Sequence, residues 1–469
     1  MSLKKNYIYN TINQLLTMLV SIVTVPYISR VLGATNIGIY SYTYSIVSYF
    51  IMFVTLGLNN YGNREIAKCR DKRLELNTTF SEIYCMQICC GIFVLVVYFI
   101  YIVFLAKQYF FIFLIQTIYI FSSIIDINWA MYGMEEFKFT AIRNSVLTLF
   151  NFFLIILFVR NKDSLTAYTF ILAFGVFLNQ LVSWFYVIKK ISFIKPSYTG
   201  VIKHIKPNLI LFIPIVAVSL YKVMDKIMLG NLTSMRQVGF YESSEKIIRI
   251  PTILISSLGT VMLPRMTNLY ANDDGKKITT YISKSIDIAM ILSSSLCFGI
   301  MAVSKEFIPI FYGPGYEICI YIYLVLLPSC LFLAFSNVIR TQYLIPTGRE
   351  KIFIRSVILG AFVNLIINYL LIPEMQSIGA AIGTLIAEMT VCISQSFEIR
   401  HLIPIKEYIK RSIPFIILGI IMFVFIFNIE LPCERFIALL LKIILGILVY
   451  LLGLIIIFIK GKNLYNIKA

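Results

Sequence analysis

Two neighbouring apolar stretches of the chain carry an unusual density of ionisable side chains. A charge in hydrocarbon is costly, so such residues usually face a partner or a water-filled cavity. Glu242 and Lys246 are four positions apart, as are Glu245 and Arg249, so each pair can meet on one face of a helix. The pairs either neutralise each other or form the wall of a polar cavity that binds an anion. The charged residues of the two stretches are Lys222, Asp225, Lys226, Glu242, Glu245, Lys246 and Arg249.

Arg30 and Arg340 are cations whose placement allows two interpretations each. Arg30 precedes the first carboxylate of the chain, Glu65, so no acidic neighbour in sequence can neutralise it. It either extends to the outer headgroups from a helix end or lies at the outer part of a cavity. Arg340 lies late in its apolar stretch. It either belongs to the cytoplasmic excess of positive residues or contacts a phosphate, which a guanidinium binds bidentately.

Asp126 and Glu388 are single carboxylates within apolar stretches. Each could bind a coupling ion, Na⁺ or H⁺, or a sugar hydroxyl. Asp225 and Glu245 are expected to hold the neighbouring cations in place. The predicted substrate-binding cations are Arg30, Lys222, Lys246, Arg249 and Arg340, and the predicted supporting or ion-coupling carboxylates are Asp126, Asp225, Glu245 and Glu388.

The sequence has no pattern typical of catalysis, a metal site or nucleotide binding. Cys85, Cys89 and Cys90 have no His or carboxylate at ligand spacing, so we expect small apolar residues within a helix. His204 and His401 have no nucleophile around them and are expected to be ordinary loop residues. No glycine-rich phosphate loop and no zinc-protease motif occurs. We therefore expect no enzyme and no cofactor other than a coupling ion.

The composition indicates a membrane protein. Of 469 residues, 59% are hydrophobic and only 14% are charged, whereas soluble chains carry roughly 25% charged residues. The net charge of +18 could suggest nucleic-acid binding. The Lys and Arg residues, however, form short clusters between apolar stretches, which is the pattern that orients membrane proteins. We expect no nucleic-acid partner.

Fourteen segments are long and apolar enough to span a bilayer, which takes about 20 residues. Most Lys and Arg residues outside them lie at the two termini and in loops that follow even-numbered spans. This imbalance predicts cytoplasmic termini. The predicted spans are 8–32, 36–59, 80–105, 109–132, 141–159, 165–188, 208–230, 236–262, 282–303, 317–345, 352–372, 377–399, 412–429 and 436–459.

The spans fall into two similar blocks of six, followed by two more. Three sequence matches recur in the same order in both blocks, which indicates a duplication. An even number of spans per block predicts a parallel repeat, and such transporters place substrate between two lobes that alternate access. We predict an all-α fold with two six-helix lobes in a V. The predicted parts are an N-lobe (1–190), a cytoplasmic linker (191–207), a C-lobe (208–400) and an accessory hairpin (401–469).

The first span also carries a stripe of polar residues. Asn13, Thr17, Ser21 and Thr24 follow one another at spacings of four, four and three, which places them on one face of a helix. The stripe could face a wet cavity, where hydroxyls and amides would meet sugars, or it could pack against close neighbouring helices.

Several short motifs occur in order along the chain. They are Asn13, Pro26-Tyr27, Arg30-Val31-Leu32-Gly33, Gly38-Ile39-Tyr40, Asn63-Arg64-Glu65, Asp225-Lys226-Ile227-Met228-Leu229-Gly230, Gly239-Phe240-Tyr241, Pro264-Arg265 and Gly379-Ala380-Ala381-Ile382-Gly383-Thr384. In these motifs the chain resembles Wzx-type flippases of O-antigen and other polysaccharide repeat units, and the resemblance covers essentially the whole chain. Those flippases belong to the polysaccharide-transporter branch of the superfamily that also contains multidrug antiporters and lipid II flippases.

The resemblance implies a function in the bacterial cytoplasmic membrane. Undecaprenyl-pyrophosphate-linked oligosaccharides would be turned from the inner to the outer leaflet, for assembly of O-antigen, capsule or exopolysaccharide. Membrane lipids, and a polysaccharide polymerase with its chain-length regulator, would be the partners. Two alternatives stay open at this point. One is an ion-coupled multidrug antiporter of the same superfamily, although the first span lacks an acidic residue. The other is a non-transporting scaffold of the polysaccharide machinery.

Overall fold

The computed structural model describes the backbone of residues 3–272 and 275–465. Those two ranges contain helices joined by short turns, and no strand occurs in them. The chain divides into two compact units, which we call unit 1 (Met1–Ser219) and unit 2 (Leu220–Ala469). Some side chains lie outside the description, namely those of residues 3–8, 10–11, 214, 217, 220–222, 275–276 and 460–465.

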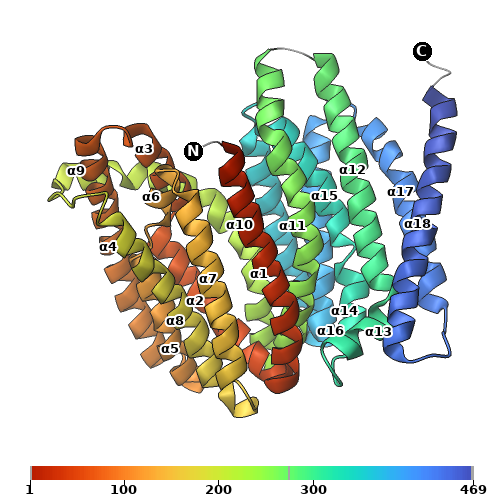
Figure 1. The fold of residues 1–469 in the computed structure, drawn as a ribbon, viewed down its shortest axis with the longest axis horizontal. Coiled ribbons are helices and arrows are strands. Elements are labelled where there is room, and N and C mark those ends of the chain that lie inside the picture. The colour runs from red at the N-terminus through yellow and green to blue at the C-terminus, as the bar shows by residue number, and fades with distance from the viewer. Residues whose placement is uncertain (1–2, 273–274, 466–469) are drawn as a thin grey trace. The chain divides into compact units, whose positions relative to one another are not determined.

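Unit 1 consists of helices that run mostly along one common direction (Figure 1). Two short 3₁₀ turns, Lys107–Tyr109 and Lys162–Ser164, precede α5 and α8. The helices are α1 (Leu3–Val31), α2 (Gly33–Thr55), α3 (Leu58–Cys69), α4 (Arg73–Phe104), α5 (Phe110–Ile124), α6 (Asn128–Gly133), α7 (Phe137–Phe158), α8 (Leu165–Val187), α9 (Tyr198–Lys203) and the first part of α10 (Ile205–Leu232).

Unit 2 begins within α10 and contains the remaining helices. A π-helical turn at Arg340–Leu344 follows α15, and π turns often occur at functional positions. The helices are α11 (Met235–Ala271), α12 (Gly275–Ala302), α13 (Ser304–Phe311), α14 (Ile318–Leu326), α15 (Ser329–Ile339), α16 (Glu350–Ile399), α17 (Ile405–Asn428) and α18 (Arg435–Tyr465).

Twelve helical segments of the described residues are long and apolar enough to cross a membrane. One of them, α16, covers two predicted spans, 352–372 and 377–399, which meet at a kink at Gln376. Predicted span 208–230 corresponds to α10, which includes side chains outside the description. The chain is therefore a multi-pass membrane protein, as predicted, and the count of fourteen spans stays a prediction.

The two units repeat the same lengths of helical segment. Gly33–Cys69 in unit 1 and Met235–Ala271 in unit 2 each have 37 residues. Lys107–Gly133 and Ile318–Leu344 each have 27 residues. The first pair differs internally: α2 and α3 are separated at Leu56, where φ is 47°, whereas α11 continues through the corresponding part of the chain. These lengths agree with the duplication that the sequence predicts.

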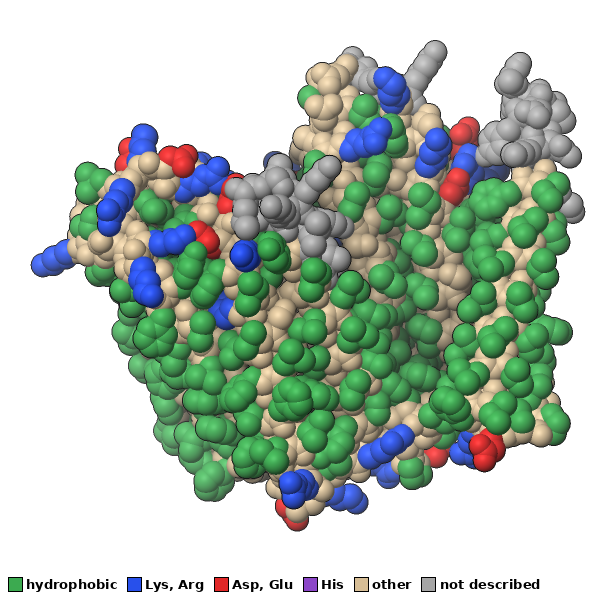
Figure 2. Space-filling view, in the orientation of Figure 1, with side chains coloured by type: hydrophobic (Ala, Val, Ile, Leu, Met, Phe, Trp, Pro, Cys, Tyr) green, Lys and Arg blue, Asp and Glu red, His purple; other side chains and the backbone are tan. Residues whose placement is uncertain are grey.

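Apolar side chains cover the helices along their length, and charged side chains gather near the helix ends (Figure 2). Among the most exposed are Phe93 and Phe111 in unit 1 and Tyr369 in unit 2. Large apolar surfaces of this kind face lipid in a membrane protein, because hydrocarbon solvates them as well as a protein core does. The surface pattern thus fits the apolar composition of the chain.

A buried tryptophan positions part of the polar interior of unit 1. Trp129 on α6 is packed with Ile66 and Phe80, and its indole N–H donates to Gln87 Oε1 at 3.0 Å. The preceding residue, Asn128, begins α6 and points its side-chain oxygen toward Arg143. The short helix α6 is therefore held by a core, and it carries a polar group to the neighbouring helix α7.

Two glycines of α16 allow close approach in unit 2. A Cβ on Gly379 would lie 2.6 Å from the backbone oxygen of Leu371 across the kink at Gln376. A Cβ on Gly383 would lie 2.0 Å from Asn368 Oδ1. The glycines therefore let the second half of α16 fold tightly against the first and bring Asn368 beside Thr384.

Candidate functional site

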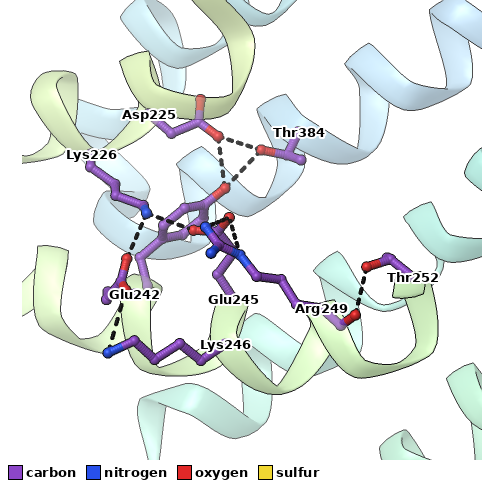
Figure 3. A network of polar contacts seen from close by, with 9 residues as sticks. Asp225, Lys226, Glu242, Glu245, Lys246, Arg249, Thr252 and Thr384 are labelled. Atoms are coloured by element: carbon purple, nitrogen blue, oxygen red, sulfur yellow. Dashed lines mark hydrogen bonds and ion pairs between the residues drawn. The ribbon is translucent and has the colours of Figure 1, made fainter. Parts of the chain in front are cut away.

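A charge network connects α10 and α11 in unit 2 (Figure 3). At its centre, Lys226 Nζ lies 2.5 Å from Glu242 Oε2 and 2.8 Å from Glu245 Oε2. The side chain of Lys226 is only 9% exposed. Two carboxylates around one buried ammonium satisfy the condition under which a buried charge is tolerated.

Two further cations attach to the outer oxygens of the same carboxylates. Lys246 Nζ lies 3.5 Å from Glu242 Oε1, and Arg249 Nη2 lies 2.9 Å from Glu245 Oε1. Their side chains are 30% and 57% exposed, in contrast to Lys226. Among the described side chains of this network, three cations face two carboxylates, which is a surplus of positive charge. The predicted i, i+4 pairs are thus formed, and their cationic ends stay partly exposed.

Asp225 belongs to a separate group of neutral partners. Its Oδ1 accepts from Asn368 Nδ2 at 2.6 Å, and its Oδ2 accepts from Tyr241 Oη at 2.7 Å and Thr384 Oγ1 at 2.5 Å. In the described part of the chain Asp225 thus contacts neutral partners, whereas Glu245 contacts Lys226 and Arg249. The expectation that both carboxylates hold the neighbouring cations stays a prediction. Asp225 and Lys226 have different partners because they are adjacent on α10, so their side chains point to different sides of the helix (Figure 3).

The other predicted cations lie in different settings. Arg30 is exposed one residue before the end of α1. Arg340 begins the π-helical turn, and its guanidinium lies 5.1 Å from the ring centre of Phe353. The side chain of Lys222 lies outside the described residues. The structure thus brings Lys246 and Arg249 together, and the roles of Arg30, Lys222 and Arg340 stay predictions.

The single carboxylates differ from each other in their surroundings. Asp126 Oδ1 accepts from the backbone N–H of Asn128 at 2.9 Å, which forms an Asx turn before α6. This contact gives Asp126 a local structural role. Glu388 is 7% exposed on the second half of α16. Its role in ion coupling stays a prediction.

Arg143 is a buried cation near the start of predicted span 141–159, and it was not among the predicted site residues. It is 5% exposed on α7, and its Nη2 donates to Asn128 Oδ1 at 2.8 Å and to Asn144 Oδ1 at 2.9 Å, while Nη1 donates to Ser183 Oγ. No acidic residue precedes it at helical spacing. The asparagines around it were a usable signal, because Asn is uncommon in apolar spans unless it has a partner.

His204 was expected to be an ordinary loop residue and is instead buried. It is 4% exposed between α9 and α10; Tyr61 Oη lies 2.6 Å from its Nδ1, and Glu82 Oε2 lies 3.2 Å from its Nε2. Lys203 Nζ lies 2.6 Å from the same Glu82 oxygen. Burial lowers the pKa of His204 below its usual 6.5, while the hydrogen bond to Glu82 acts in the opposite direction. The linker before α10 is therefore anchored to α3 and α4.

Comparison with known sequences identifies relatives that span most of the chain. A protein of Escherichia coli (strain K12) named for O-antigen transport is 23% identical over 400 residues, which cover 83% of this chain and 95% of the relative. The capsular polysaccharide biosynthesis protein CapF of Staphylococcus aureus is 23% identical over 398 residues, covering 83% of this chain and 97% of the relative.

Solved structures share the fold. The lipid II flippase MurJ in an inward closed conformation matches with a TM-score of 0.77 and 16% identity, over 97% of this chain and 99% of that one. An outward-facing multidrug resistance transporter of the MATE family matches with a TM-score of 0.57 and 14% identity, over 87% and 97% of the two chains. The chain therefore shares its fold with these two proteins. A family profile described as "Polysaccharide biosynthesis protein" matches residues 3–270, and the chain belongs to that family.

Proposed function

We propose that the chain turns undecaprenyl-pyrophosphate-linked oligosaccharides from the inner to the outer leaflet of the bacterial cytoplasmic membrane, by alternating access. The products would feed the assembly of O-antigen, capsule or exopolysaccharide, together with a polymerase and its chain-length regulator. The family membership and the names of the relatives support this proposal. Both termini would lie in the cytoplasm, following the distribution of Lys and Arg.

The observation that carries the proposal is the surplus of positive charge around Lys226. A diphosphate cannot cross hydrocarbon without compensating charge, because an isolated ion there is very costly. Lys246 and Arg249 are partly exposed, so they can bind an anion, while Glu242 and Glu245 keep them in position. A binding site for a drug cation would need the opposite balance of charge. The network therefore favours the flippase over the antiporter.

Removal of the two exposed cations tests the proposal. The double variant K246A/R249A, reconstituted in proteoliposomes, should translocate a lipid-linked oligosaccharide about tenfold more slowly or worse, because a hydrogen bond to a charged group contributes about 1.5–3 kcal/mol. Translocation is measured as the fraction of sugar that a membrane-impermeant oxidant reaches. K72A is the matched control, since Lys72 also pairs with a nearby glutamate (Glu75) on an exposed surface.

Other outcomes identify the alternatives. A scaffold would show no translocation by the wild-type protein and no effect of either variant. An antiporter would expel a cationic dye and leave the lipid-linked oligosaccharide on its original side. Either result contradicts the flippase.

Ion coupling completes the proposal, with Asp225 as the coupling site. The buried Asp225 carboxylate, the Thr384 hydroxyl and the amide of Asn368 supply oxygen atoms, which are the ligands that hard cations prefer. Asn368 Oδ1 is buried and has no hydrogen-bond partner among the described residues, so it can accept a cation or a proton donor. D225N should abolish the stimulation of translocation by an imposed gradient of Na⁺ or of H⁺, whichever stimulates the wild type. Equal stimulation of the variant and the wild type would contradict this assignment.

A further inference from the structure

Unit 1 contains a polar cavity of about 380 Å³ among α1, α6, α7 and α8. Sites for small molecules have volumes of about 300–1,000 Å³. Apart from Arg143, its polar groups are neutral, while Leu147 and Val176 add apolar wall. The lining, as far as the described residues show it, includes no carboxylate. Its carboxamides belong to Asn13, Asn128, Asn144, Asn151, Asn179 and Gln180.

Hydrogen bonds hold the wall of the cavity in a fixed arrangement. The Arg143 guanidinium and Asn179 Nδ2 both donate to Asn144 Oδ1, at 2.9 Å each. Because two donors occupy that oxygen, the amide nitrogen of Asn144 is the group left to bind a ligand. Asn13 Oδ1 accepts from Ser145 Oγ at 3.1 Å, which fixes the contribution of α1. The polar stripe on the first span thus contributes Asn13 and Thr17 to a cavity.

Asn151, on the α7 wall of this cavity, carries an unsatisfied polar atom. Its Oδ1 is buried without a hydrogen-bond partner among the described residues. Asn151 lies ~21 Å along α7 from Phe137, the first residue of that helix. A buried acceptor without a hydrogen bond at that position costs free energy. The glycine at position 175 leaves room for the Asn151 side chain, because a Cβ at Gly175 would lie 2.1 Å from Asn151 Nδ2. A buried acceptor of this kind needs an explanation, and a ligand hydroxyl would supply its donor.

We propose that this cavity is a subsite for one pyranose ring of the transported oligosaccharide, an inference that rests on the function proposed above. Carboxamides both donate and accept hydrogen bonds, so an array of them matches the hydroxyl and acetamido groups of a sugar. Arg143 repels a drug cation, and its guanidinium is already bonded to the neutral oxygens of the wall. The sugar therefore meets neutral groups here, unlike the diphosphate, which requires the exposed cations.

Binding of two lipids by the full-length protein in nanodiscs tests the subsite. The probes are undecaprenyl diphosphate and the same lipid carrying the repeat unit, isolated from the source cells. N151L and N179L should each weaken binding of the glycosylated lipid about three- to tenfold, which corresponds to one hydrogen bond, and should leave the sugar-free lipid unaffected. N151L should also unfold at or above the wild-type temperature, since it removes an unmet acceptor. N428L, at an exposed position near the end of α17, is the control and should bind both lipids normally.

The outcomes separate the subsite from the function. Equal weakening for both lipids, or no weakening, would overturn the subsite while leaving the flippase intact. Failure of the wild type to bind either lipid would overturn the flippase. In that case, thermal stabilisation of the wild type but not of N151L by the free oligosaccharide would still support the subsite, and its absence would overturn it.

Discussion

Three cations within one network of unit 2 have different physical roles. Lys226 on α10 is enclosed by two carboxylates of α11, so its ion pairs hold the two helices together. Lys246 and Arg249 share the same carboxylates but extend outward, and exposed ion pairs contribute only about 0–1 kcal/mol to stability. Burial therefore separates Lys226, which builds the network, from the two cations that we propose bind the substrate.

Substitution of the central lysine should unfold the network. K226A leaves Glu242 and Glu245 facing each other without their shared counter-ion, and removal of one partner from a buried ion pair costs about 3–5 kcal/mol. K246A should cost less than about 1 kcal/mol. Equilibrium unfolding in detergent micelles measures both values. Equal stability of the two variants would show that the burial of Lys226 has no energetic consequence.

The anchor at His204 should respond to pH. Because burial lowers the folded-state pKa of His204, its contribution to stability is complete above pH 6.5 and is lost as the pH falls below that value. Protonation would turn Nδ1 of His204, which faces Tyr61 Oη, into a hydrogen-bond donor. It would also place a positive charge beside Lys203, which Glu82 and Glu65 would partly offset. Hydrogen–deuterium exchange of residues 198–204, corrected for intrinsic rates, should accelerate between pH 7.5 and pH 5. H204N should remove the pH dependence, and an unchanged dependence would exclude His204 as the titrating group.

At the scale of elements, the kink in α16 determines which side chains of its two halves can meet. Gln376 has a φ of 52°, so the chain reverses its course between the two halves of α16. Gly379 then approaches the backbone of Leu371, and Asn368 and Thr384 from the two halves both bond Asp225. The oxygen group around Asp225 therefore depends on a backbone feature some residues away.

A methyl group at the kink should separate the two halves of α16. G379A places its Cβ against backbone atoms that cannot rotate away, so we expect a loss of stability of at least about 1–3 kcal/mol and loss of ion-stimulated translocation. G446A is the matched control in α18, because its nearest contact would be an ordinary 3.8 Å from Met422 Sδ. That control should be neutral or slightly stabilising. Thermal unfolding compares the two variants, and similar midpoints would contradict the role of Gly379.

The sequence was sufficient for elements whose signal is local and insufficient for contacts made across helices. Apolar length predicted the helices, and i, i+4 spacing predicted the pairs around Glu242 and Glu245. The polar surroundings of Arg143 were not predicted, because neutral partners such as Ser183 lie on another helix. The partners of Asp225 are as many as 159 positions away, so no local pattern could have predicted them.

At the scale of the whole molecule, the equal lengths of repeated segments support a duplicated chain. The copies have diverged in chemistry, since unit 1 has a carboxamide cavity and unit 2 a charge network. The orientation in the membrane rests on the positive residues of the loops and has a direct test in the native cysteines.

Cys433 should be accessible from outside the cell. It is exposed in the turn between α17 and α18, which the predicted orientation places on the outer side. In spheroplasts, a membrane-impermeant maleimide should label the wild type and not C433S. A cysteine introduced by S197C, on the linker before α9, should be labelled in the C433S background only after the membrane is opened. The reverse pattern would invert the topology.

The modest charge surplus of the network around Lys226 also limits how long a cargo stays. If the cargo is the diphosphate proposed above, it carries more than one negative charge. The single surplus positive charge among the described side chains would not neutralise it fully, and the glutamates would repel the remaining charge. A transporter has to release its substrate in each cycle, and many tight contacts would prevent that release. The carboxylates would therefore shorten the time for which the headgroup stays bound. Substitution of both glutamates by neutral residues would lengthen that time and slow turnover.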